Sequence, residues 1–372
     1  MDIITLLKSA KDRNASDLHI VVGRPPLFRV DGSLIFDEGE PHLSAEDVKQ
    51  AFQRVITEAE QAEFERNLEL DFGRTIPEVG RVRFNAALQQ GTVSLVIRLL
   101  PPKIPTIDDL GLPEICKDLV TRPRGLVVVS GPTGSGKSTT LAAMIEHLNQ
   151  NEKRRVVTME DPVEYTYVNK NSTITQRELG SDTLSFAEAL RHVLRQDPDV
   201  ILVGEMRDLE TASSALTVAE TGHLVLTTGH APSTSQAVER IINMFPPHER
   251  YLAQARLASL LLGVLCQTLV PRASGKGRVA AIEVMLANAA VRNLIREGKT
   301  YQLPNTIRMN TQLGMELLDQ ALLRLYQGGD ISRQSLFDYC NDREEITRFI
   351  GEQAGRRSKE EPSNAFYSQQ MD

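Results

Sequence analysis

The sequence predicts an α/β protein of two domains, the second built on a mostly parallel sheet with helices on both faces. From about residue 108, short β-branched runs alternate with amphipathic segments, which is typical of such a sheet. A glycine-rich turn stands between an apolar strand and a helical segment at residues 126–148. Three prolines within residues 101–105 favour an extended connector between the domains.

The first predicted domain is a smaller α+β unit over residues 1–99. Strands are expected at residues 17–22, 27–30 and 33–36, with Asp31 and Gly32 forming the turn before the last of them. A helix is predicted from Ser44, which forms a capping box with Asp47, to about Asn67. Two further strands are expected at residues 81–88 and 93–99.

In the strand at residues 81–88, Arg81, Arg83 and Asn85 alternate with apolar residues and therefore share one face. This face is either a solvated sheet surface or one that faces phosphate or a neighbouring subunit. Pattern alone does not decide between the two.

After a proline-rich linker at residues 100–107, the second domain is predicted over residues 108–354. The expected strands lie at residues 126–130, 155–159, 199–204, 223–228 and 278–285. The expected helices lie at residues 138–149, 186–196, 208–220 and 247–268, and the part from about 287 to 350 is mainly helical. The polar tail at residues 355–372 is predicted to be disordered.

Composition narrows the classes of function. A net charge of −7 and a pI of about 5.7 argue against a nucleic-acid partner. The three cysteines, Cys116, Cys266 and Cys340, lie far apart and indicate a reducing compartment. The longest apolar stretch, Leu257 to Cys266, is about half of a membrane span and is interpreted as a buried helix. We therefore expect a cytoplasmic protein without direct membrane insertion.

The turn at residues 131–138 fits the phosphate-binding pattern G-x-x-x-x-G-K-[ST] at every fixed position. Its glycines let backbone N–H groups converge on phosphate oxygens at a helix N-terminus. Lys137 is expected to reach the β- and γ-phosphates, and the Ser138 hydroxyl to bind Mg²⁺. The nucleotide-binding candidates are Gly131, Pro132, Thr133, Gly134, Ser135, Gly136, Lys137, Ser138 and Thr139.

Polar residues end the neighbouring strands. Glu205 closes the strand at residues 199–204 where an acid beside the Mg²⁺ is expected, or else it caps that strand. Glu160 and Glu164 follow another strand, in either a catalytic edge that polarises water or a surface loop. His230 ends a third strand as a phosphate sensor or a structural histidine, and its spacing to other histidines indicates no zinc site.

Together these segments resemble the secretion-ATPase superfamily, the hexameric motors of type IV pili and type II secretion. The similarity lies in residues 160–164 (Glu-Asp-Pro-Val-Glu), 204–208 (Gly-Glu-Met-Arg-Asp) and 219–230. Residues 15–19, 194–199, 290–297 and 314–320 are similar to the branch that retracts pili. The resemblance covers about residues 3–351.

The resemblance implies a RecA-like ATPase domain, a PAS-like N-terminal domain, and roles for individual residues. Glu164 is the implied catalytic base, Glu205 supports Mg²⁺, and His230 reads nucleotide state. Arg81, Arg83 and Arg98 match N-domain arginines that approach the phosphates when the domains close. Residues 228–231 read Thr-Gly-His-Ala where the family usually has Thr-Leu-His-Thr, which bears on the sensor step.

The implied function is a Mg²⁺-dependent ATPase motor that powers pilus retraction. Its implied cofactors are ATP and Mg²⁺, and its implied partners are five further copies in a homohexamer, an inner-membrane platform protein and related pilus ATPases. One alternative is a motor of pilus assembly or type II secretion, although such proteins usually carry a tetracysteine zinc site. Another alternative is a nucleotide-binding adaptor with little turnover of its own.

Overall fold

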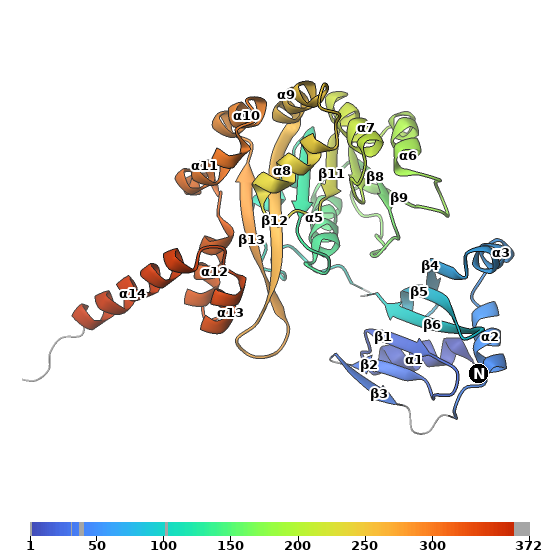
Figure 1. Ribbon diagram of the computed structural model, residues 1–372. Coiled ribbons are helices and arrows are strands. Elements are labelled where there is room, and N and C mark those ends of the chain that lie inside the picture. Colours follow the sequence, from blue (N-terminus) through green and yellow to red (C-terminus); the bar gives the residue numbers. More distant parts are fainter. Residues whose placement is uncertain (1, 31, 37–40, 101–102, 361–372) are drawn as a thin grey trace, which may run out of the picture. The chain divides into compact units, whose positions relative to one another are not determined.

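The computed structural model describes residues 2–30, 32–36, 41–100 and 103–360 (Figure 1). The chain divides into two compact units. The first comprises residues 1–106 and 141–205, and the second comprises residues 107–140 and 206–372. The predicted domain limits at residues 99 and 108 stay predictions, because this division follows other boundaries.

The N-terminal part holds a six-stranded antiparallel sheet in the order β3-β2-β1-β6-β5-β4 (Figure 1). Alternation along β5 puts Val82, Phe84 and Ala86 fully into the core, as its sequence pattern predicts. The strands are β1 (Asp17–Ile20), β2 (Leu27–Val30), β3 (Ser33–Phe36), β4 (Glu69–Ile76), β5 (Gly80–Gln89) and β6 (Thr92–Leu99). The helices are α1 (Ile3–Asp12), α2 (Ala45–Gln53) and α3 (Glu58–Asn67).

The single helix predicted from Ser44 to Asn67 is wrong, because two helices occupy this segment. The capping box of Ser44 and Asp47 is confirmed at the start of α2. Thr57 begins α3 with a second capping box, in which its side chain accepts from the Glu60 N–H. An N-cap residue is extended rather than helical, so one helix cannot run through Thr57. Helix α1 and strand β4 were not predicted from the sequence, and the predicted turn residue Asp31 lies outside the described residues.

The second sheet has seven strands in the order β13-β12-β7-β11-β10-β8-β9. The pairs β7–β11, β7–β12, β8–β10 and β8–β9 are parallel, and the long hairpin of β12 and β13 is antiparallel. All five predicted strands of this domain are confirmed. The strands are β7 (Gly125–Ser130), β8 (Arg155–Glu160), β9 (Thr173–Glu178), β10 (Val200–Val203), β11 (Leu224–Thr228), β12 (Leu261–Pro271) and β13 (Arg278–Leu286).

Helices connect most of these strands and make up most of the C-terminal part, as predicted. Asp208 caps α7 by accepting from the Thr211 N–H. The helices are α4 (Ile115–Val120), α5 (Lys137–Asn151), α6 (Phe186–Val193), α7 (Leu209–Glu220), α8 (Thr234–Asn243), α9 (Arg250–Leu260), α10 (Ala289–Arg296), α11 (Leu303–Met309), α12 (Leu318–Gln327), α13 (Arg333–Tyr339) and α14 (Arg343–Glu360).

Strand β9 was not predicted, and two predicted segments differ from the expectation in this region. The helix predicted over residues 247–268 ends at Leu260, and the chain continues as strand β12, which pairs with both β7 and β13. Its second half therefore gains two sets of sheet hydrogen bonds, which outweigh the helical pattern of its leucines. The tail predicted to be disordered from residue 355 continues α14 through Glu360, and residues 361–372 lie outside the described residues.

No helix within the described residues combines the length and the apolar character that a bilayer span needs.

Candidate functional site

The glycine-rich loop joins β7 to α5, as its sequence motif predicts. All six residues of β7 are buried, and the loop turns out of the sheet at Gly131, which has a φ of 141°. A Cβ atom at Gly131 would lie 2.3 Å from the backbone oxygen of Gln267 on β12 and 2.7 Å from the Ser135 hydroxyl. Only glycine fits this close approach, so the loop is held tightly against the neighbouring strand.

Lys137 is buried and folds back over the loop. Its ammonium group donates to the carbonyl oxygens of Gly131 and Pro132, at 2.8 and 3.0 Å. The Ser135 hydroxyl is buried without a hydrogen-bond partner among the described atoms, whereas Ser138 is exposed at the start of α5. A compact loop with a buried cation, an unpaired hydroxyl and a helix N-terminus fits a phosphate group.

Strand β12 supports the loop from outside the motif. The Gln267 carboxamide oxygen accepts a 2.7 Å hydrogen bond from the Thr140 hydroxyl, and both groups are buried. The Gln267 amide nitrogen lies 2.9 Å from where a Cβ of Gly136 would be. Sequence reasoning missed this residue, although a glutamine within an apolar run was an available signal.

His230 follows β11, which pairs with β7 in parallel. Beside it, the Ser130 hydroxyl donates to the Ala231 carbonyl oxygen at 2.9 Å and accepts from the Ala231 N–H at 2.8 Å. A Cβ at Gly229 would lie 3.2 Å from that hydroxyl. Glycine at position 229 thus leaves room for the paired hydrogen bonds, which tie the segment around His230 to the strand before the phosphate-binding loop.

The acidic residues after β8 differ in their surroundings. The Glu160 carboxylate accepts from the Thr158 hydroxyl at 2.7 Å and from the Gln176 amide at 3.1 Å. Burial raises the pKa of Glu160 above its ordinary value, those two hydrogen bonds oppose the rise, and the nearby charge of Glu164 adds to it. Glu164 itself is half-buried. The Glu160 carboxylate is therefore already occupied by hydrogen bonds from Thr158 and Gln176, which favours Glu164 as the acid that contacts a substrate.

Glu205 lies two residues after the end of β10 at Val203 and is half-buried. The preceding Gly204 donates its N–H to the Met159 carbonyl oxygen on β8 at 2.7 Å. A Cβ at Gly204 would approach that oxygen to 3.1 Å. Close pairing of β10 with β8 explains why a glycine, not a second acid, precedes Glu205.

The three candidate arginines each have an acidic partner. Arg81 forms an ion pair with Glu178, and only 17% and 9% of the two side chains are exposed. Arg83 lies 3.6 Å from Asp71, and Arg98 donates from Nε to Asp17 at 2.9 Å. The predicted shared face of Arg81, Arg83 and Asn85 is confirmed by the alternating burial of β5, but Arg81 is not on a fully solvated surface.

The candidates fall into two groups by compact unit. The phosphate-binding loop and His230 belong to the unit of residues 107–140 and 206–372. Glu164, Glu205 and the three arginines belong to the other unit. Within the described residues, no group of three or more His, Cys, Asp or Glu side chains could hold a metal ion. A cation bound through Ser138 would therefore need phosphate oxygens or water among its other ligands.

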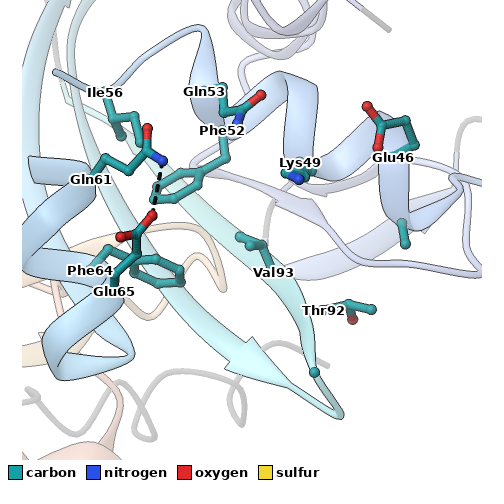
Figure 2. A pocket seen from close by; sticks show the side chains of 12 residues that line it. Glu46, Lys49, Phe52, Gln53, Ile56, Gln61, Phe64, Glu65, Thr92 and Val93 are labelled. Carbon is teal, nitrogen blue, oxygen red and sulfur yellow. Dashed lines mark hydrogen bonds between the residues drawn. The ribbon is translucent and has the colours of Figure 1, made fainter. Parts of the chain in front are cut away.

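A separate pocket of about 330 Å³ lies in the N-terminal part between α2, α3 and the turn from β5 to β6 (Figure 2). The rings of Phe52 and Phe64 meet edge to face there, with centroids 4.8 Å apart. Gln61 donates to Glu65 at its rim. None of the candidate site residues lines this pocket.

Comparison with known proteins identifies relatives that match nearly the whole chain. The type IV pilus retraction ATPase PilT of Pseudomonas aeruginosa is 44% identical over 335 residues, which cover 90% of this chain and 97% of that protein. A twitching motility protein of Neisseria gonorrhoeae is 41% identical over 90% of this chain and 89% of its own length.

A crystal structure of the pilus retraction motor PilT with bound ADP superposes with a TM-score of 0.88 at 41% identity. The match covers 94% of this chain and 99% of that one. The family model of the Type II/IV secretion system protein matches residues 2–328. The chain therefore belongs to the Type II/IV secretion system protein family.

Proposed function

We propose that the protein is an ATP-hydrolysing motor that powers the retraction of type IV pili. The observation that carries this is its near full-length similarity to a pilus retraction ATPase, together with a glycine-rich loop whose buried Lys137 donates to the loop's own carbonyl oxygens. A relative with bound ADP supports nucleotide binding at this loop.

In this proposal the loop of residues 131–139 binds the ATP phosphates. Lys137 exchanges its contacts with the Gly131 and Pro132 carbonyls for phosphate oxygens, and Ser135 gains a partner for its hydroxyl. Ser138 and Glu205 would hold Mg²⁺ directly or through water. When bound, the ion neutralises charge that develops on the phosphates.

Glu164 would act as the general base that orients and deprotonates the attacking water. Glu160 is tied to Thr158 and Gln176, so it serves the shape of this segment rather than the proton transfer. His230 would sense the γ-phosphate, and its tie through Ala231 to Ser130 couples it to the loop. Arg81, Arg83 and Arg98 would offset phosphate charge.

We further propose that the protein works as a homohexameric ring in the cytoplasm, with ATP-driven movement between its two domains. The ring would act on an inner-membrane platform protein, and related pilus ATPases are candidate co-motors. Support for this comes from the family to which the chain belongs. Light scattering of the purified protein with and without ATP tests the ring.

Phosphate release by wild type and Glu164→Gln tests the catalytic assignment. We expect both proteins to bind a fluorescent ATP analogue, and the variant to lose about 100-fold or more in kcat because general base catalysis contributes that much. Asp199→Asn is the matched control. Asp199 is an exposed acid before β10, at the opposite end of that strand from Glu205, and it accepts from the Arg155 N–H at 2.8 Å.

Wild-type turnover in the variant would refute Glu164 as the base. If wild type itself binds ATP and releases no phosphate, the adaptor alternative replaces the enzyme. Deletion of the gene in the source bacterium tests whether the motor retracts or assembles pili. A retraction motor leaves cells piliated but unable to twitch, whereas loss of the pili would identify an assembly motor.

A further inference from the structure

A row of charged residues crosses the N-terminal sheet. The register pairs Arg29 with Asp17, Asp17 with Arg98, and Arg98 with Arg83 across β2, β1, β6 and β5. Directly paired residues of neighbouring strands lie on the same face of a sheet. Arg81 lies two residues before Arg83 and therefore shares that face. Asp17 is thus an acid placed between arginines.

Asp17 is buried, with only 7% of its side chain exposed, whereas its partner Arg98 is 64% exposed. One carboxylate oxygen accepts from Arg98 Nε at 2.9 Å, and the other accepts from the Ser16 hydroxyl at 2.8 Å. Arg29 Nε lies 4.0 Å from that second oxygen. The Asp17 carboxylate is therefore fixed in the sheet, and it holds the Arg98 guanidinium through the Nε–H group.

Burial by itself would raise the pKa of Asp17, but the hydrogen bonds from Ser16 and Arg98 outweigh it and hold the pKa below its ordinary value. The carboxylate is consequently charged at neutral pH. A pair whose arginine is this exposed adds little to stability, since solvent screens its attraction. The pair instead orders the long Arg98 side chain, which would otherwise sample many rotamers.

We propose that Asp17 is a positioning residue that presents the guanidinium of Arg98 to the phosphates of the nucleotide. A guanidinium carries five N–H donors in a planar fork, so a carboxylate on the Nε side leaves the opposite end available to an anion. Fixing that fork beforehand lowers the ordering cost of the anion contact. The inference rests on the proposed function, in which Arg98 meets phosphate, and it gives the segment at residues 15–19 a role.

The test is a double-mutant cycle in the full-length protein, using Asp17→Asn, Arg98→Ala and both together. Steady-state phosphate release gives kcat and KM, and a non-hydrolysable ATP analogue gives a Kd that does not depend on turnover. We expect Asp17→Asn to lower kcat/KM about tenfold, the equivalent of roughly 1.4 kcal/mol. In the Arg98→Ala background the same change should cause no further loss, because no guanidinium is left to position.

Glu60→Gln is the matched control. Like Asp17, Glu60 is a poorly exposed acid that pairs with an arginine, Arg74, and hydrogen bonds hold its pKa down against the effect of burial. Arg74 pairs with the buried Val82, between Arg81 and Arg83, so it lies on the opposite face of the sheet from the row of Asp17. Loss of the Glu60–Arg74 pair should therefore lower the melting temperature but leave kcat/KM unchanged. If Asp17→Asn does not fold, Ser16→Ala removes the other bond to the carboxylate and carries the same comparison.

The outcomes distinguish a failure of the positioning role of Asp17 from a failure of the proposed function on which it rests. An unchanged kcat/KM in Asp17→Asn, or an equal loss in both backgrounds, overturns the positioning role and leaves the function intact. If Arg98→Ala changes neither turnover nor Kd, the phosphate contact of Arg98 is itself wrong and the positioning role falls with it.

Discussion

Replacing Gly131 with alanine tests whether close packing against β12 shapes the phosphate-binding loop. The new Cβ would lie 2.3 Å from the Gln267 backbone oxygen, and a backbone atom cannot move aside as a flexible side chain can. Overpacking of this kind costs about 1–3 kcal/mol. The φ of 141° adds a further cost of about 1–3 kcal/mol for a residue with a side chain. Together these costs predict a total loss of about 2–6 kcal/mol in the free energy of unfolding.

Gly222→Ala is the matched control for Gly131→Ala. Gly222 also has a positive φ, 100°, but nothing lies within 4 Å of its Cβ position. It therefore carries the conformational cost alone, about 1–2 kcal/mol. The difference between the variants in urea unfolding isolates the clash, and only Gly131→Ala should lose affinity for a fluorescent ATP analogue. Equal unfolding midpoints, or unchanged nucleotide affinity in Gly131→Ala, would refute the packing argument.

Two further predictions concern titrating groups. Cys116 and Cys266 are buried, and burial raises the pKa of each to about 12. A disulfide reagent should therefore label only the half-exposed Cys340 in the native protein, and all three thiols in denaturant. Rapid labelling of more than one thiol per native chain would contradict this prediction. Burial opposes ionisation of Glu146, but hydrogen bonds from Lys170, Gln150 and Asn149 hold its pKa below 4.5. Because that pKa is depressed in the folded state, its contribution is present at neutral pH and fades as the pH falls below about 4.5. Glu146→Gln should therefore unfold more easily than wild type at pH 7, with a gap that narrows in acid, and a gap that is independent of pH would refute the assignment.

Local pattern was enough where the chain's own neighbours decide the structure. The strand, loop and helix around Lys137 follow from a motif whose parts are adjacent in sequence, and the β7 strand is buried as its β-branched run predicts. The alternation around Arg81 likewise gave the correct face of β5.

Pattern failed where partners distant in sequence decide. The leucines after residue 257 suit a helix, and only pairing with β7 and β13 makes residues 261–271 a strand. Gln267 and Asp17 escaped notice for the same reason. Each acts on a residue far along the chain, Thr140 and Arg98 respectively, and no local periodicity records such a contact.

The contact of Gln267 with the loop has an evolutionary consequence. Its backbone oxygen forbids a side chain at Gly131, and its amide both crowds Gly136 and satisfies Thr140. The eight residues of the phosphate-binding motif therefore do not determine the loop's conformation alone, because contacts from Gln267 on β12 also constrain it. We expect positions 140 and 267 to vary together among descendants of this sequence, so that a lineage that lost one partner would accept changes at the other.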